Sequence, residues 1–289
     1  MAETSEEMLC ERVLGEHEIL VKAGLRPTAL PAEAWIRNFP GQERVAAALL
    51  RRFVYVSELE FEKWLEAAFV RLMSAVDREH SEPLATTLAR MVFFPTQKET
   101  PSVTASGFGV CRLLRQVCGL AEDRFAADAD DLQQRALAGE RVVLVDDCVG
   151  SGSQLLSTAE ELQAQTGRLP SGLAALAHHD GIAAARHHSI PVYFGAHIEE
   201  LTSIKRTKLA PDEHPTTRAE LLQFLDSESA VLDLRREEWA TDGVSYPYGF
   251  RELGQTIVFR HSKPDWTLPL YWAEHIDAAS EWTPLDKRT

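Results

Sequence analysis

The sequence predicts an α/β protein whose parallel sheet follows an N-terminal helical domain. Apolar residues recur at helical spacing before Pro83, whereas short apolar strands alternate with helices after it. The run 142–145 (Val-Val-Leu-Val) is apolar without alternation, which is typical of a strand buried on both faces of a parallel sheet. We therefore predict a helical domain at residues 1–88 and an α/β domain at 89–289, with an inserted helical and acidic segment at about 199–247.

Prolines divide the N-terminal domain into helices, including short ones at 35–39 and 46–53. Ser57 and Glu60 have the spacing of a capping box, in which two side chains satisfy free backbone N–H groups at the start of a helix. The helix that follows has one apolar face, made by Phe61, Trp64, Leu65, Ala68, Phe69, Leu72, Met73 and Val76. We expect this face to pack in the core rather than to bind an aromatic ligand.

Strands and helices alternate in the α/β domain. We expect strands at 91–94, 142–145, 173–177, 191–194 and 256–260, and helices at 108–117, 155–164, 182–187 and 217–225. An acidic linker is expected at 122–131, before the second strand. Parallel strands need crossover connections, which are usually helices, so this order predicts a parallel sheet.

Two adjacent carboxylates and a turn of small residues follow the strand at 142–145. Asp146 and Asp147 come directly after the apolar residues, where a buried charge is costly unless it meets a ligand. The residues from Gly150 to Ser153 allow the backbone to approach an anion closely, and free N–H groups at the start of the next helix attract phosphate. This run therefore predicts a site for a phosphorylated sugar.

The same run resembles the phosphoribosyl pyrophosphate (PRPP) motif of the type I phosphoribosyltransferases, in which an apolar strand, two acids and two apolar residues precede a Thr/Ser/Gly-rich loop. The resemblance implies a type I phosphoribosyltransferase-like core. It implies that Asp146 and Asp147 contact the ribose 2′- and 3′-hydroxyls, directly or through Mg²⁺. The loop that would hold the 5′-phosphate comprises Gly150, Ser151, Gly152, Ser153 and Gln154. Gln154 departs from the pattern, which has a phosphate-binding Thr at this position, although an amide can also donate a hydrogen bond.

The resemblance implies two further parts of the site. The loop after the first strand would bind pyrophosphate, with Lys98, Ser106 and Gly107 as candidate ligands. A lone Lys in a polar loop is, however, usually just solvated. The turn after the third strand would border the acceptor pocket, so Asp180 and Gly181 are secondary candidates for binding.

Other nucleotide sites share parts of the pattern at 146–154. A dinucleotide site needs a third glycine, but Leu155 stands there, and no Gly-Lys-Ser/Thr follows to make a P-loop. The run from Asp147 also resembles the adenosylmethionine-binding turn of the DNA amino-methyltransferases. Their second motif has adjacent prolines and an aromatic residue, and the nearest candidate, Ser-Tyr-Pro-Tyr at 245–248, lacks the second proline. A methyltransferase is therefore a less favoured alternative.

Four histidines suggest a metal site beside Asp180, and they are His178, His179, His187 and His188. Adjacent residues point in different directions on a strand or a helix, so neighbouring histidines do not readily chelate one ion together. We expect them to serve as polar ends of strands and helices. The four cysteines include no Cys-x-x-Cys pair, which fits reduced thiols. We expect Cys148 to pack under the loop, because two neighbouring carboxylates disfavour its thiolate.

Composition limits the partners. The net charge is −14, from 30 Lys and Arg against 44 Asp and Glu, which argues against bulk binding of nucleic acid or of an anionic membrane. The compact basic cluster of Lys205, Arg206 and Lys208 is expected to be a solvated loop. Residues 1–7 are acidic and polar rather than a signal peptide, and no apolar run approaches the ~20 residues of a membrane span. We expect a cytoplasmic protein.

The C-terminal segment makes the resemblance more specific, because it indicates one family among the phosphoribosyltransferase-like proteins. An apolar strand precedes Pro-x-x-Thr-Leu-Pro-x-x-Trp at 264–272 and Trp-x-Pro-Leu at 282–285, and the N-terminal helices contain Trp-Ile-x-x-Phe at 35–39. Together these features resemble the bacterial phosphoribosyltransferase-like family associated with conflict and defence systems. Core packing, rather than stacking on an acceptor base, is expected for the tail aromatics Trp266, Tyr271 and Trp272.

The resemblance implies a pentosyltransferase that uses PRPP with Mg²⁺. Its acceptor would be a base, a nucleotide or an RNA, and its role that of a bacterial antiviral defence effector with a protein partner from a defence operon. The alternative is a non-catalytic sensor that binds PRPP or another nucleotide and acts through a partner. Gln154 leaves both alternatives open.

Overall fold

The computed structural model of the chain contains two compact units. Unit 1 comprises Met1–Glu58 and Glu200–Thr289, and unit 2 comprises Leu59–Glu199. The structure describes residues 5–28, 30–79, 82–97, 106–198, 218–233, 247–249, 252–260, 264, 266–277 and 279–286.

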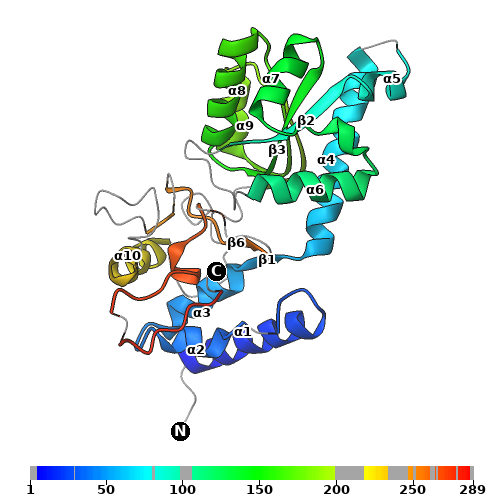
Figure 1. Ribbon diagram of the computed structural model, residues 1–289. Coiled ribbons are helices and arrows are strands. Elements are labelled where there is room, and N and C mark those ends of the chain that lie inside the picture. Colours follow the sequence, from blue (N-terminus) through cyan, green and yellow to red (C-terminus); the bar gives the residue numbers. More distant parts are fainter. Residues whose placement is uncertain are drawn as a thin grey trace. The chain divides into compact units, whose positions relative to one another are not determined.

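A four-stranded parallel sheet forms the centre of unit 2 (Figure 1). Its strands, in spatial order, are β2 (Met91–Pro95), β3 (Arg141–Val149), β4 (Ser171–His178) and β5 (Val192–Ile198). All residues of β2 and β4 are buried, as expected for a parallel sheet with helices on both faces. The structure confirms the predicted α/β class.

Three helices cover one face of this sheet (Figure 1). α7 (Ala129–Leu137) precedes β3, α8 (Ser153–Thr166) connects β3 to β4, and α9 (His179–His187) connects β4 to β5. The strands follow one another in chain order, so right-handed crossovers place the connecting helices on the same side. Leu155 of α8 belongs to the same buried apolar cluster as Leu144 of β3.

α4 (Glu58–Glu79) covers the opposite face. Its buried residues confirm the predicted apolar face, and they are Phe61, Leu65, Ala68, Leu72 and Val76. The Phe69 ring lies 6.2 Å from that of Phe93 in β2, centroid to centroid. A β-carbon on Gly195 of β5 would lie only 1.8 Å from the backbone oxygen of Trp64, so the close approach of α4 requires glycine there.

Three further elements of unit 2 flank β2. α5 (Leu84–Leu88) precedes it, while α6 (Ser106–Cys118), which packs against β2 and β3, and the 3-10 turn η1 (Glu122–Arg124) follow it. The acidic linker expected at 122–131 contains η1 and the first turn of α7. Asp128 caps α7 by accepting a hydrogen bond from the backbone N–H of Asp131, and acidic residues stabilise the first turn of a helix.

Unit 1 joins the two ends of the chain. The N-terminal segment contributes α1 (Ser5–Lys22), α2 (Ala32–Arg37), α3 (Glu43–Arg52) and β1 (Val54–Val56). The C-terminal segment contributes α10 (Arg218–Glu228), the 3-10 turns η4 (Ser229–Val231) and η7 (Pro269–Tyr271), and β6 (Ile257–Phe259). β1 and β6 pair in parallel as a two-stranded sheet, which joins the N-terminal segment to the C-terminal segment.

An aromatic core holds unit 1 together. Trp35 Nε1 donates a hydrogen bond to the backbone oxygen of Leu270 at 3.0 Å. The Tyr271 hydroxyl donates one to the backbone oxygen of Leu49 at 2.9 Å. Trp266 and Trp272 are also buried. The expectation that the tail aromatics pack in the core is therefore confirmed.

The two units differ from the predicted division at residue 88. α4 groups with unit 2 because its apolar face covers the sheet, whereas the C-terminal segment groups with unit 1 because it packs around α2 and α3. Apolar spacing identifies a helix but not the surface that it covers. The predicted helix at 217–225 is confirmed by α10, while most of the segment 199–247, including the basic cluster, lies outside the described residues.

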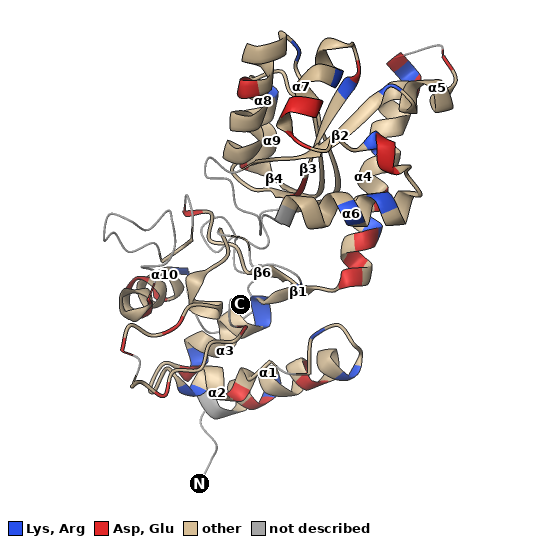
Figure 2. Cartoon of the chain, in the orientation of Figure 1, with Lys and Arg blue, Asp and Glu red and all other residues tan. Residues whose placement is uncertain are grey.

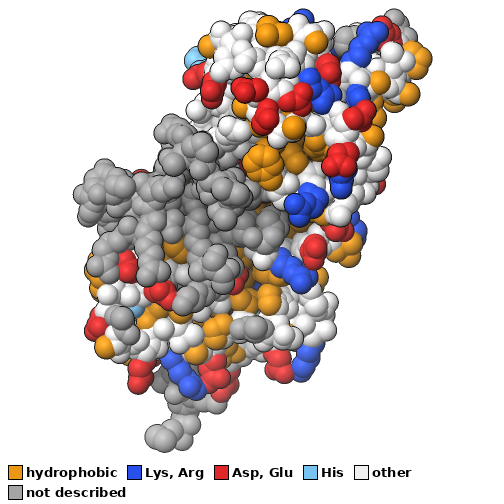
Figure 3. Space-filling model, viewed as in Figure 1, with side chains coloured by type: hydrophobic (Ala, Val, Ile, Leu, Met, Phe, Trp, Pro, Cys, Tyr) orange, Lys and Arg blue, Asp and Glu red, His pale blue; other side chains and the backbone are white. Residues whose placement is uncertain are grey.

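Charged residues lie mainly on the helices (Figure 2). Within the four strands of the large sheet the charged residues are Arg141, Asp146 and Asp147. Basic and acidic side chains are interspersed on the visible described surface (Figure 3). In the part of the chain that the structure describes, no helix is long and apolar enough to cross a membrane.

Candidate functional site

β3 carries Asp146 and Asp147 beyond the end of β2. The last residue pair between the two strands is Pro95 with Val145, whereas β4 continues to pair with β3 as far as Val149. β3 is longer than the predicted strand at 142–145 because β4 holds it in the extended conformation. The two acids consequently lie at the carboxyl edge of the sheet, where parallel α/β folds bind their ligands.

Asp146 is a buried carboxylate, with 6% of its surface exposed. Its Oδ2 atom accepts a hydrogen bond from Thr96 Oγ1 at 2.6 Å, and its Oδ1 atom accepts one from the backbone N–H of Asp147 at 2.9 Å. Asp147 is partly exposed. The two neighbouring acids therefore have different environments, and Asp147 is the more accessible one.

The environment of Asp146 disfavours its ionised form. Burial raises the pKa of Asp146 well above its usual range, and the negative charge of Asp147 raises it further. The hydrogen bonds from Thr96 and from the backbone N–H of Asp147 act in the opposite direction, because they stabilise the carboxylate. Burial is the largest of these effects.

The turn after β3 is built for close backbone packing. Gly152, which caps α8, has a φ of 82°, the left-handed conformation that favours glycine. A β-carbon on Gly181 of α9 would lie 2.5 Å from the backbone oxygen of Gly150. Ser151 Oγ and Ser153 Oγ share a hydrogen bond of 2.7 Å. The turn thus brings two hydroxyls to the start of a 14-residue helix, where free backbone N–H groups attract anions.

Gln154 connects α8 to the end of β2. Its Nε2 atom donates a hydrogen bond to Thr96 Oγ1 at 3.2 Å and lies 3.5 Å from the Thr96 backbone oxygen. One turn later, Thr158 Oγ1 lies 2.9 Å from the backbone oxygen of Gln154 and accepts a hydrogen bond from the backbone N–H of Gln97 at 3.0 Å. The Gln154 side chain, which stands where the motif has a phosphate-binding Thr, is therefore hydrogen-bonded within the protein.

Comparison with protein families bears on the choice between a phosphoribosyltransferase-like protein and a methyltransferase. The model of the PRTase-CE family matches residues 32–288, which include most of both units. The chain belongs to the PRTase-CE family. The match confirms the predicted membership of a phosphoribosyltransferase-like family, and it disfavours the methyltransferase alternative. Comparisons with curated proteins and with solved structures gave no significant match.

In this PRTase-CE chain the structure brings Asp146 and Asp147 together with the turn at 150–154. Of the predicted pyrophosphate ligands, Lys98 lies outside the described residues, and Ser106 is the first residue of α6. Gly107 packs on Pro95, where a β-carbon would lie 2.7 Å from the proline Cβ. This contact gives Gly107 a structural reason to be glycine.

The predicted acceptor-side residues lie at the start of α9. The backbone N–H of Asp180 donates to His178 Nδ1 at 3.1 Å, so His178 caps this helix. Gly181 packs against the turn after β3, as described above. His178 ends β4, His187 ends α9 and His188 follows it, in line with the prediction that these histidines terminate strands and helices.

Thr96 belongs to the site of this PRTase-CE chain, but the sequence did not identify it as a site residue. It is 1% exposed, and its backbone N–H donates to the oxygen of Val145 at 3.0 Å. Its role depends on the pairing of β2 with β3, which brings position 96 beside position 146. A threonine directly after a buried strand was the available signal, but only the strand order makes it specific.

The donor set bears on the expected Mg²⁺. Among the described residues, no group of three or more His, Cys, Asp or Glu side chains is arranged to hold a metal ion. Magnesium commonly binds one or two carboxylates and takes its other ligands from water and substrate phosphates. The acidic pair fits an ion of that kind, with Asp147 as its more accessible ligand.

Cys148 directly follows the acidic pair in β3 and is buried. Burial raises the pKa of its thiol, and the charges of Asp147 and Asp146 raise it further. The thiolate is therefore disfavoured, and the packing role predicted for Cys148 fits this environment.

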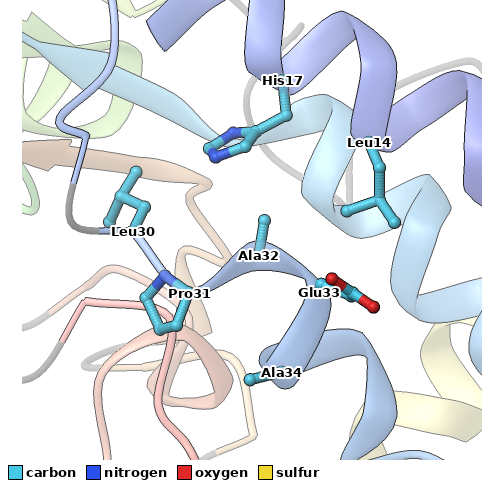
Figure 4. Close-up of a pocket in the computed structure, with 7 residues that line it drawn as sticks. All are labelled: Leu14, His17, Leu30, Pro31, Ala32, Glu33 and Ala34. Carbon is cyan, nitrogen blue, oxygen red and sulfur yellow. The ribbon is translucent and has the colours of Figure 1, made fainter.

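A separate hollow of about 440 Å³ lies in unit 1, between α1 and the start of α2 (Figure 4). Its lining residues are Leu14, His17, Leu30, Pro31, Ala32, Glu33 and Ala34. His17 and Arg26 form a hydrogen bond of 2.9 Å, and Arg37 pairs with Glu33. Because its lining is mostly apolar and its charged groups are paired, this hollow lacks the features of a sugar-phosphate site.

Proposed function

We propose that this PRTase-CE protein binds PRPP together with Mg²⁺ at the carboxyl edge of the unit 2 sheet. One observation carries the proposal: Asp146 and Asp147 extend beyond β2 and are followed by a glycine turn that opens α8. A carboxylate for sugar hydroxyls and a helix start for a phosphate group are thus offered by one continuous stretch of chain.

Each part of this stretch has a distinct task in binding. The 5′-phosphate would accept hydrogen bonds from the free N–H groups at the start of α8 and from the hydroxyls of Ser151 and Ser153. The partly exposed Asp147 would accept hydrogen bonds from the ribose hydroxyls. Mg²⁺, when bound, would offset the charge of the pyrophosphate, which an acidic protein cannot do alone.

We further propose that the protein transfers the phosphoribosyl group to a base, a nucleotide or an RNA. In such a transfer pyrophosphate leaves C1′ through a state with positive charge on the sugar ring. The chain needs no covalent intermediate, because positioning and electrostatic stabilisation can supply the rate. The carboxylate of Asp147, held near the ring, would stabilise this charge.

Isothermal titration of the whole chain with Mg²⁺ and PRPP tests the proposal. We expect binding by the unaltered protein and none by the double variant Asp146→Asn, Asp147→Asn. Circular dichroism should show that the double variant is folded, since Asn has nearly the shape of Asp. Equal affinity of the two proteins would refute the assignment.

A second function is favoured by one observation. Gln154 is hydrogen-bonded to Thr96 instead of being free for a phosphate, and a weaker phosphate contact suits a protein that binds PRPP without turning it over. Such a protein would act as a sensor that signals to a partner. Product analysis with a panel of bases, nucleotides and RNA separates the two functions, because only the transferase releases pyrophosphate in the presence of an acceptor.

The cellular setting of this activity is also a proposal. The conflict-system family that the sequence resembles suggests a defence effector in the cytoplasm that acts with a protein partner. Deletion of the gene from its host, followed by infection with phage, tests this role, and unchanged phage yield would contradict it.

A further inference from the structure

Thr96 and Gln154 form a chain of hydrogen bonds that ends on Asp146. Gln154 Nε2 donates to Thr96 Oγ1 at 3.2 Å, and Thr96 Oγ1 donates to Asp146 Oδ2 at 2.6 Å. The Thr96 backbone oxygen, 3.5 Å from Nε2, favours this orientation of the amide, because a second oxygen would be repelled there. Since the amide nitrogen only donates, the Thr96 hydroxyl accepts from it and directs its own proton to Asp146.

The end of this chain of bonds at Asp146 is buried, whereas Gln154 is partly exposed. Thr96 is 1% exposed and Asp146 is 6% exposed. The second oxygen of Asp146 accepts the backbone N–H of Asp147 at 2.9 Å. Both oxygens of the buried acid thus have protein partners, and one of these partners is the backbone of Asp147.

We propose that Thr96 and Gln154 are positioning residues, which hold Asp146 so that it orients Asp147, the acid that contacts the ligand. The inference rests on the proposed PRPP-binding function and assigns separate tasks to the two acids of the motif. Asp146 is the buried support, and Asp147 is the contact.

The length of Gln154 explains why this residue can serve here. Its amide nitrogen stands two bonds further from Cβ than a threonine hydroxyl does, so it spans the gap from α8 to the end of β2. The hydrogen bond from the backbone N–H of Gln97 to Thr158 Oγ1 joins the same two parts of the chain one turn further along α8. Gln154 therefore exchanges a contact with phosphate for a contact that supports the acidic pair.

Titration calorimetry of the full chain with Mg²⁺ and PRPP tests this assignment. We expect Thr96→Val, which keeps the shape but removes the hydroxyl, to weaken binding about tenfold. Thr96→Ser, which restores the hydroxyl, should return the affinity to within about threefold of the unaltered protein. Gln154→Ala should also weaken binding, and the double variant Thr96→Val, Gln154→Ala should bind no more weakly than Thr96→Val alone, because both changes break one chain of bonds.

Thr166→Val is the matched control, since the Thr166 hydroxyl donates to the backbone oxygen of Leu162 and accepts from the backbone N–H of Arg168, at the end of α8 remote from the turn. Its affinity should equal that of the unaltered protein. If the unaltered chain does not bind Mg²⁺ and PRPP, the proposed function and this inference both fail. If it binds but Gln154→Ala binds equally well, or Thr96→Ser fails to restore affinity, or the double variant shows additive losses, the positioning role alone is overturned. Gln154→Ala decides the matter even if Thr96→Val does not fold.

Discussion

At the scale of single residues, Asp146 and Asp147 show how neighbours of one chemical type acquire different properties. Successive side chains of a strand point to opposite faces, so the two carboxylates enter different surroundings. Asp146 is buried against Thr96, whereas Asp147 is partly exposed. The sequence predicted both acids as one pair, because the pattern of apolar and acidic residues does not reveal which acid is buried.

The raised pKa of Asp146 predicts a pH-dependent stability. An acid whose pKa is higher in the folded state stabilises the fold most at low pH, and that stability is lost as pH rises from about 4 through the folded-state pKa. Each unit of the shift corresponds to about 1.4 kcal/mol. The variant Asp146→Asn cannot ionise at this position, so it does not lose this stability as pH rises, and its amide can donate to Thr96 Oγ1. The thermal unfolding temperature of the variant, relative to that of the unaltered protein, should therefore increase from pH 4 to pH 8. A difference that is constant or shrinks would contradict this.

At the scale of elements, the site depends on how closely the start of α9 approaches the turn after β3. Gly181 makes this approach possible, since its β-carbon would meet the backbone oxygens of Gly150 and Val149 at 2.5 and 2.7 Å. Backbone atoms cannot move aside as flexible side chains do. The resemblance implied that Gly181 is a secondary candidate for ligand binding, whereas its packing role is visible only in the structure.

Gly181→Ala should therefore destabilise the protein by about 1–3 kcal/mol, as overpacking of a filled space does. Gly109→Ala is the matched control, because Gly109 also lies in a helix, α6, and its β-carbon would meet no atom within 4 Å. There the better helix propensity of Ala should stabilise the protein by up to about 1 kcal/mol. Urea unfolding of both variants measures the difference, and equal stabilities would show that α9 does not press on the turn.

Local sequence patterns predicted most elements of unit 2. The buried strand at 142–145, the helix after the turn and the end of that helix at Gly167 all have local signals, namely apolar runs, small residues and a glycine with positive φ. The links between elements had no such signal. The bond from Gln154 to Thr96 joins residues 58 positions apart and exists only because β2 and β3 are neighbours.

At the scale of the whole molecule, the two ends of the chain build unit 1 and the middle builds unit 2. The bond from Trp35 to Leu270 spans 235 residues, and the one from Tyr271 to Leu49 spans 222. The sequence predicted that the tail aromatics are buried, but not what covers them, because hydrophobicity does not encode the partner. This explains why the predicted division at residue 88 and the observed units differ.

This division predicts how damage to one unit spreads. Tyr271→Ala removes a fully buried ring from unit 1, a change that typically costs about 3–5 kcal/mol. Hydrogen exchange should then speed up in α3 while β3 and β4 keep their protection. Tyr193→Ala, in β5, is the converse control and should affect β3 and β4 instead. Equal loss of protection in both regions of the Tyr271→Ala variant would show that the chain unfolds as one unit.

The most direct test of the central claim is the electron density of a crystal grown with Mg²⁺ and PRPP. We expect the ribose to lie on Asp147 and the 5′-phosphate on the turn from Gly150 to Gln154, with Asp146 still bonded to Thr96. Density for the ligand elsewhere on the chain, or an empty sheet edge at saturating PRPP, would contradict the account.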